Sequence, residues 1–346
     1  MKRKNFIKTL STASVISFLP SEKILSYTSV KGDQKIKPGR LKQGDTIALV
    51  APGSYISEEE LNNSVENLHS LGFKVVYNES VLYKNGYFSG NDKQRAEELI
   101  EMFSRKDVDG IMCVRGGYGC IRILPLLDYE IIKKNSKVLI GYSDVTALLY
   151  GIYSKTGFIC FHGPVGISTF NEFTIKYFKD VLAFPHNRLE LVSEPEENGE
   201  EPVKISSGKA EGELIGGNLS VIVSLIGTEY DIDTEDKIIF LEETREEPYR
   251  IDKMLTQMIM AGKFDKAAGI ALGVFDNCEQ KKDNPSFESS FTLMEVLKER
   301  LSGLGVPVVY GLSFGHIKNK FILPVGLKAE LNSEEKRITL LEPACV

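Results

Sequence analysis

The sequence predicts an α/β protein with two domains. Short apolar runs with the length of buried strands recur along the chain, amphipathic stretches with the period of helices separate them, and glycine-containing loops follow several of the runs. Alternation of strands and helices predicts a parallel sheet that carries helices on both faces. The length of 346 residues exceeds one typical core and suits two domains.

The first domain is expected over residues 42–187. Ser57 and Glu60 form a capping box that opens a helix after the first strand, and another helix begins near Asp92. Ligands of parallel sheets bind beyond the carboxyl ends of the strands, so the loops at 51–53, 115–119 and 141–144 should converge there. The four expected strands span residues 46–51, 73–77, 110–114 and 138–140.

The second domain is expected over residues 212–346. The acidic segment 188–211 contains proline and glycine and has no apolar period, which is typical of a linker between domains. Gly216, Gly217 and Asn218 open the first helix of this domain. Its strands are expected at 238–241, 269–275 and 308–310, its later helices around 251–258 and 293–301, and a closing edge strand at 337–341.

Ser143 lies where the pattern of the chain changes from strand to helix. Gly141 breaks the strand at 138–140, and from Val145 onward apolar residues recur with helical spacing. A strand-to-helix turn of this kind lifts a serine oxygen above the carboxyl edge of a sheet, as a nucleophile requires. The alternative is that Ser143 and Asp144 only cap the following helix, a role that both residue types fill well.

Four histidines are candidates for the general base. His69 falls on the polar side of the first helix, and His186 lies near the linker. His162 follows an apolar run and precedes a glycine, whereas His316 follows the strand at 308–310. Either of the last two could act as a base, and each could instead be a hydrogen-bonded structural histidine.

The sequence gives little support for other kinds of catalytic or metal site. The motifs H-E-x-x-H and G-x-x-x-x-G-K-[ST] are absent, G-x-S-x-G is not matched around Ser143, and K-T-G at 155–157 precedes the S-x-x-K runs that it should follow. The five cysteines form no C-x-x-C pair, so neither zinc nor a disulfide framework is predicted. We expect no metal and no cofactor. A net charge of −6, without a basic run interleaved with aromatics, argues against nucleic acid as a partner.

The first 35 residues have the order of an export signal. Basic residues precede a weakly apolar stretch at 10–19, and polar residues follow. Residues 3–8 resemble a twin-arginine motif in which Lys4 stands where the second arginine belongs. We expect export to the periplasm and no transmembrane segment in the mature chain. The alternative is a ragged basic N-terminus on a cytoplasmic protein.

Six segments, taken in order, resemble the LD-carboxypeptidase family of serine peptidases, which includes murein tetrapeptide carboxypeptidases and microcin C immunity peptidases. The resemblance implies a Rossmann-like N-terminal domain, a smaller α/β C-terminal domain, an active site in the cleft between them, and a homodimer. It extends from about residue 42 to residue 341, and the matching segments are 50–53, 114–119, 141–144, 216–219, 241–243 with 248–252, and 314–316.

The resemblance also assigns roles to particular residues. It implies that Ser143 is the nucleophile, that His316 is the general base, and that Glu242 is the acid that orients His316. Glu243 is adjacent to Glu242, but the alternation of a strand would turn it to the opposite face. The backbone N–H groups of Gly117 and Asp144 would form the oxyanion hole.

The implied reaction is hydrolysis of the amide that joins an L-centre to the terminal D-Ala of a murein tetrapeptide, through an acyl-enzyme. Arg115 and Arg250 are candidates to bind the free carboxylate, because arginine matches it as a fork; each could instead form a structural ion pair. One alternative is an immunity peptidase that cleaves aminoacyl-nucleotide amides, which the lack of tryptophan disfavours. A catalytically silent protein that binds cell-wall peptides is the other.

Overall fold

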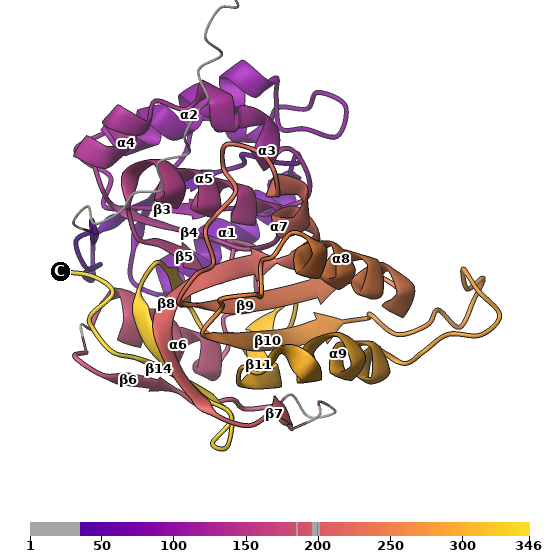
Figure 1. Cartoon of the computed structure of the whole chain (residues 1–346). Helices are drawn as coiled ribbons and strands as arrows, with labels where there is room; N and C mark the ends of the chain where they lie inside the picture. Colours follow the sequence, from indigo (N-terminus) through magenta and orange to yellow (C-terminus); the bar gives the residue numbers. More distant parts are fainter. Residues whose placement is uncertain (1–34, 185, 196–198, 200) are drawn as a thin grey trace, which may run out of the picture.

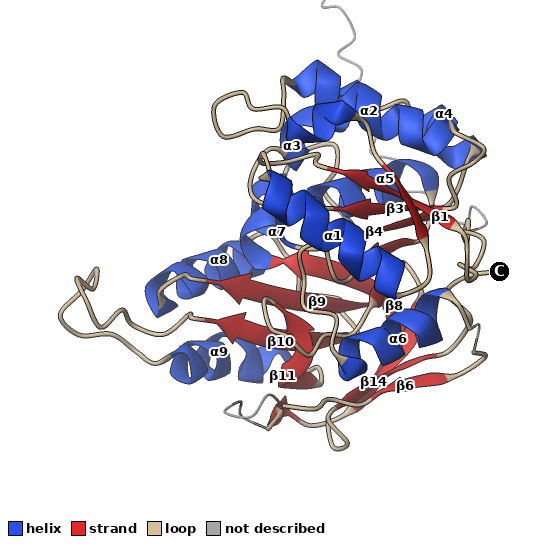
Figure 2. Ribbon diagram, turned by 180° about the vertical axis from the view of Figure 1, so that it is seen from behind, coloured by secondary structure: helices blue, strands red, loops and turns tan. Residues whose placement is uncertain are grey.

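The computed structural model describes residues 35–184, 186–195, 199 and 201–346. Residues 1–34, which hold the predicted export signal, lie outside the described residues. The described chain forms two sheets with helices packed around them (Figures 1 and 2). Each half of the chain therefore supplies most of the strands of one sheet, in agreement with the predicted α/β fold.

The first sheet has six strands in the order β12-β5-β4-β3-β1-β2. Its five N-terminal strands are parallel, whereas β12 comes from the far end of the chain and pairs with β5 in antiparallel fashion. The strands are β1 (Thr46–Val50), β2 (Lys74–Val76), β3 (Gly110–Cys113), β4 (Val138–Gly141), β5 (Cys160–His162) and β12 (Leu323–Val325).

Helices cover both faces of this sheet. Figures 1 and 2 show α1 on one face and α5 on the other. The predicted capping box of α1 is present, with the Ser57 side chain accepting from the Glu60 N–H and the Glu60 side chain accepting from the Ser57 N–H. The helices of this half are α1 (Glu58–Ser70), α2 (Asp92–Ser104), α3 (Cys120–Ile123), α4 (Tyr129–Lys134), α5 (Thr146–Thr156) and α6 (Glu172–Leu182), with short 3₁₀ turns at η1 (Glu79–Leu82), η2 (Leu124–Leu126) and η3 (Ser143–Val145).

The second sheet has eight strands in the order β6-β14-β13-β8-β9-β10-β11-β7. Its four central strands, β8 to β11, are parallel, and α7, α8 and α9 connect them in turn. The strands are β6 (Leu189–Leu191), β7 (Val203–Ser206), β8 (Lys209–Asn218), β9 (Lys237–Thr244), β10 (Gly269–Asp276), β11 (Val308–Gly315), β13 (Lys328–Asn332) and β14 (Arg337–Leu340); the helices are α7 (Leu219–Leu225), α8 (Pro248–Met260), α9 (Leu293–Leu301) and the 3₁₀ turn η4 (Ser302–Leu304).

Two expectations for the second half are wrong. The segment 188–211 is not a plain linker, because it contains β6, β7 and the start of β8; its strands are too short to show a period, and their partners are distant in the sequence. The strand predicted at 337–341 is not an edge strand. It is β14, which pairs with β13 on one side and with β6 on the other.

An aromatic cluster joins the two sheets. His162 of β5 packs edge-on against Phe240 of β9 and Phe314 of β11, with ring centroids 5.4 and 6.2 Å away, and all three side chains are buried. Tyr142 approaches the same imidazole at 6.1 Å. Edge-to-face pairs of this kind add about 0.5–1.5 kcal/mol each beyond the area that they bury.

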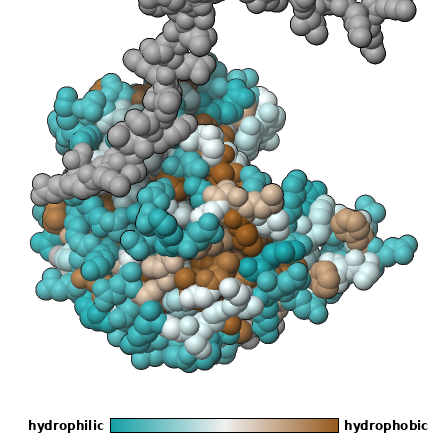
Figure 3. Space-filling model, in the orientation of Figure 1, coloured by the Kyte–Doolittle hydropathy of each residue, from teal (hydrophilic) through white to brown (hydrophobic). Residues whose placement is uncertain are grey.

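The surface seen in Figure 3 is mostly hydrophilic, with hydrophobic residues gathered across its middle. The loop between β10 and α9 projects from the body of the protein (Figure 1) and carries the exposed side chains of Phe287 and Phe291. Within the described ranges, no helix combines the length and the apolar character that crossing a membrane requires.

We expect His162 to make the fold sensitive to acid. Burial lowers its pKa to about 4, below the ordinary value of about 6.5 in an unfolded chain. A lowered histidine pKa contributes stability that is complete above about pH 6.5 and is lost as pH falls toward 4. Between pH 7 and pH 4.5, His162 should therefore account for a loss of about 2 kcal/mol in the free energy of unfolding.

Urea unfolding of the wild type and of His162→Phe at the two pH values measures this contribution. The variant cannot titrate at this position, so its stability should fall less than that of the wild type. An equal fall in both proteins would contradict the assignment of the acid sensitivity to His162.

Candidate active site

Ser143 occupies a strained turn at the carboxyl end of β4. Its φ is +65°, in the left-handed region that residues with a β-carbon rarely adopt. Neither Ser143 nor Asp144 caps the helix that follows through its side chain, because the residues at the N-caps of η3 and α5 are Tyr142 and Val145. The helix-cap alternative is therefore wrong. Strained residues of this kind are concentrated at functional sites.

Glu242 and His316 form a hydrogen-bonded pair on the second sheet, in which Glu242 is buried and His316 is partly exposed. Glu242 lies in β9 with no exposed surface, and its Oε2 is 2.7 Å from Nδ1 of His316, which follows β11. The ring of Tyr142 packs edge-on against the His316 imidazole with centroids 4.8 Å apart. Because Tyr142 directly precedes Ser143, this contact brings the imidazole beside the serine turn.

Gly116 lies against the serine. A β-carbon at this position would be 2.8 Å from Cβ and 3.1 Å from Oγ of Ser143, and 3.1 Å from the backbone nitrogen of Asp144. Only glycine fits this approach, since real β-carbons do not come so close to other atoms. The loop that begins with Gly116 and Gly117 thus borders both the serine oxygen and the Asp144 N–H, where an oxyanion would form.

The side chain of Asp144 also holds this loop in place. Its carboxylate is buried and accepts a hydrogen bond of 2.9 Å from the backbone N–H of Cys120. Burial raises the pKa of Asp144, and the hydrogen bond from Cys120 opposes this shift. The Asp144 side chain therefore orders the loop 116–120. The backbone N–H of Asp144 lies in the first turn of η3, where N–H groups have no hydrogen-bond partner within the helix.

Thr146, which was not among the predicted site residues, joins the two halves beside the site, and Glu243 holds its partner Asn218. Glu243 accepts hydrogen bonds from the Asn218 side chain at 2.9 Å and from the Ser220 N–H at 2.8 Å. The Asn218 N–H donates to Oγ1 of Thr146 at 3.1 Å, and Gly217 leaves room for the Thr146 side chain. In the sequence, the Gly-Gly-Asn motif at 216–218 was the signal that could have indicated this contact.

The two candidate arginines lie in different surroundings. Nη1 of Arg115 is 3.1 Å from Oε1 of Glu60, and about a third of the Arg115 side chain is exposed. Arg250 is more exposed; its Nε is 3.3 Å from Glu246, and its guanidinium lies over the ring of Tyr249. Arg115 directly precedes Gly116, which places it beside the serine, whereas Arg250 lies in the first turn of α8.

The other histidines fit the site poorly. His162 lies in the aromatic cluster, where burial keeps it neutral, and it lacks a carboxylate partner among the described residues. His186 lies 3.7 Å from Asp180, on α6. Over the described ranges, histidines, cysteines and carboxylates form no group of three suited to a metal ion.

Comparison with known proteins defines the family. A sequence model described as the LD-carboxypeptidase N-terminal domain matches residues 47–163, and one described as the LD-carboxypeptidase C-terminal domain matches residues 211–331. A probable murein peptide carboxypeptidase of Bacillus subtilis is 36% identical over 305 residues, which cover 87% of this chain and 92% of the relative. The chain belongs to the LD-carboxypeptidase family.

Solved structures agree in fold along nearly the whole chain. The microcin C7 self-immunity protein MccF, in complex with glutamyl sulfamoyl guanosine, has a TM-score of 0.81 and 30% identity, with 90% of this chain and 99% of that chain covered. A muramoyltetrapeptide carboxypeptidase from Oxalobacter formigenes has a TM-score of 0.71 and 31% identity, with 85% and 97% covered. The two-domain α/β architecture predicted from the sequence is therefore confirmed.

The strain at Ser143 predicts a difference between two variants that both lack the hydroxyl. Ser143→Gly should be more stable than Ser143→Ala by about 1 kcal/mol, because only glycine adopts the left-handed conformation without steric cost. Thermal or urea unfolding of the two proteins measures the difference. Equal stability, or a more stable alanine variant, would mean that the turn relaxes and stores no strain.

Proposed function

We propose that the protein is a serine carboxypeptidase that removes the terminal D-Ala from murein tetrapeptides. The observation that supports it most is the hydrogen-bonded Glu242–His316 pair, which lies beside the strained turn of Ser143. Murein peptide carboxypeptidases among the family relatives support the substrate class. The bond cleaved would be the amide between an L-centre and D-Ala.

In the proposed reaction, Ser143 Oγ attacks the amide carbonyl carbon while Nε2 of His316 accepts its proton. Glu242 accepts the Nδ1–H of His316, which leaves Nε2 free as the base and stabilises the imidazolium. The N–H groups of Gly117 and Asp144 would stabilise the negative charge on the oxygen. The imidazolium then protonates the leaving amine of D-Ala, and water, deprotonated by His316, hydrolyses the acyl-enzyme.

Arg115 is our proposal for the partner of the substrate carboxylate. Its backbone is adjacent to Gly116, which touches the serine, and Glu60 engages only one of its nitrogens in the contacts described here. Arg115→Met should raise KM for the tetrapeptide by about tenfold or more, because hydrogen bonds between charged groups contribute about 1.5–3 kcal/mol. Arg250→Met should change KM less, and the reverse order would assign the carboxylate to Arg250.

The decisive test is mass spectrometry of a purified disaccharide-tetrapeptide after incubation with the protein. The wild type should release one alanine, and Ser143→Ala should release none above the blank. Release by both proteins would exclude Ser143 as the nucleophile. Release by neither would exclude the murein assignment and leave aminoacyl-nucleotide conjugates as the substrate, or a silent binding protein, which equilibrium binding of the tetrapeptide would detect.

A second candidate is cleavage of aminoacyl-nucleotide amides, because the MccF structure that resembles this chain was solved with glutamyl sulfamoyl guanosine. A nucleobase needs a flat partner, and Tyr87 and Tyr118 form an exposed aromatic pair, with centroids 5.9 Å apart, beside Gly117. Incubation with glutamyl sulfamoyl adenosine, analysed in the same way, separates the candidates. A kcat/KM higher for this compound than for the tetrapeptide would favour the second.

We also propose that the protein is exported and dimeric. The order of basic, apolar and polar residues at the N-terminus supports export, which cell fractionation would test with a Lys2, Arg3 and Lys4 to Gln variant as the control. Light scattering of the purified protein measures the oligomeric state. Retention of the wild type in the cytoplasm would exclude export, and a monomeric mass would exclude the dimer.

A further inference from the structure

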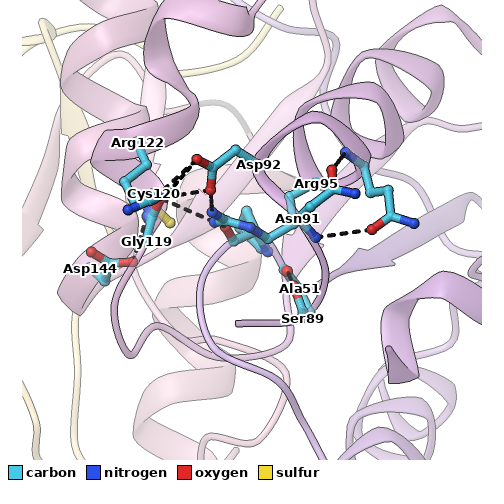
Figure 4. A network of polar contacts seen from close by, with 11 residues as sticks. Ala51, Ser89, Asn91, Asp92, Arg95, Gly119, Cys120, Arg122 and Asp144 are labelled. Carbon is cyan, nitrogen blue, oxygen red and sulfur yellow. Dashed lines mark hydrogen bonds and ion pairs between the residues drawn. The ribbon is translucent and has the colours of Figure 1, made fainter. Parts of the chain in front are cut away.

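Arg95 is a buried arginine that the proposed reaction does not use. It lies in α2, its side chain is almost fully buried, and no position of the family-like segments includes it. Figure 4 shows it between Asp92 and the segment of Gly119 and Cys120, next to Ala51 and Ser89. A buried arginine is costly unless its donors are paired, so its partners indicate what it does.

Two of those partners are backbone carbonyl groups in loops that border the candidate active site. Nη1 of Arg95 donates to the carbonyl oxygens of Pro52 and Gly119, the latter at 3.0 Å. Nη2 donates to Asp92 at 2.5 Å, and the guanidinium lies 4.7 Å from the centre of the Phe88 ring. One guanidinium therefore links the loop after β1, the loop after β3 and the start of α2.

Both loops pack against the glycine that touches the serine. A β-carbon at Gly53, next to Pro52, would lie 2.8 Å from the carbonyl oxygen of Gly116 and 2.9 Å from Oδ2 of Asp144. Gly119 precedes Cys120, whose N–H is held by Asp144. The carbonyls that Arg95 holds thus flank the short segment that includes Gly117.

We propose that Arg95 is a positioning residue for the oxyanion hole: it fixes the carbonyls of Pro52 and Gly119 and thereby holds the Gly116–Gly117 segment against Ser143. This inference rests on the proposed serine mechanism. Arginine suits the task because its planar fork presents several donors in a rigid arrangement, whereas lysine offers a mobile point charge. Asp92 balances the charge and is itself held by the exposed Arg122.

The experiment compares Arg95→Met and Arg95→Lys with Arg122→Met as the matched control. The Arg122 side chain pairs with the same Asp92 but makes no described hydrogen bond to either loop carbonyl. Its backbone N–H donates to the Gly119 carbonyl at 3.1 Å, and the substitution retains this bond. Each variant is assayed for kcat and KM with the disaccharide-tetrapeptide and for the rate at which a fluorophosphonate labels Ser143. The label needs the serine and the oxyanion hole but no murein substrate, and thermal unfolding sets an assay temperature at which every variant is folded.

Arg95→Met should lower kcat and the labelling rate together by about 10²-fold, because a small misplacement of a catalytic group has that effect. KM should change by less than about threefold, since the site of the carboxylate is not altered. Arg95→Lys should recover about tenfold of the loss, because it restores a charged donor. Arg122→Met should label at the wild-type rate within about twofold, as expected for an exposed ion pair.

Unchanged labelling in folded Arg95→Met would overturn the inference, as would an equal loss in Arg122→Met, which would trace the effect to Asp92. If Arg95→Met does not fold, Arg95→Lys decides: labelling equal to the wild type contradicts the proposal, and labelling slowed with unchanged KM supports it. A wild type that is labelled but does not hydrolyse tetrapeptide refutes the proposed substrate alone, and the labelling arm still tests Arg95.

Discussion

The contact between Thr146 and the turn of Gly217 and Asn218 is the constraint on which the site depends. Ser143 comes from the first sheet, whereas Glu242 and His316 come from the second, so no local geometry sets the distance between the proposed nucleophile and the proposed base. Thr146 fills the space beside Gly217 and accepts the Asn218 N–H, and it lies at the start of the helix that follows the serine turn. Any shift between the sheets would therefore move Ser143 relative to His316.

Much of the fold was predictable because its signals are local. Apart from β8, the parallel strands of both sheets are short apolar runs, and the capping box of Ser57 and Glu60 is a pattern of four residues. Among the missed strands, β6, β7 and β12 have three or four residues and partners far away in the sequence. The strands β5, β8 and β13 were also missed. Their pairing depends on the assembled sheets, which no short window of sequence contains.

The candidate site likewise contains residues that local sequence signals predicted and residues that they could not predict. Strand alternation was enough to expect opposite faces for Glu242 and Glu243, and the structure places one on His316 and the other on Asn218. The sequence could not rank His162 against His316 without a family pattern, because both follow apolar runs. Arg95 had no signal at all: a charged residue on a helix suggests a solvated face, and only the tertiary structure shows that its carbonyl partners are buried beside it.

The return of β12 to the first sheet limits how the two halves of the protein can evolve. The chain leaves the first sheet after β5, builds most of the second sheet, and then pairs Leu323 and Val325 with β5 before finishing β13 and β14 in the second sheet. The first sheet is thus completed by a strand from the second half. A recombination event that exchanged one half for that of a distant relative would have to carry this strand along, so the two halves should be inherited as a single unit.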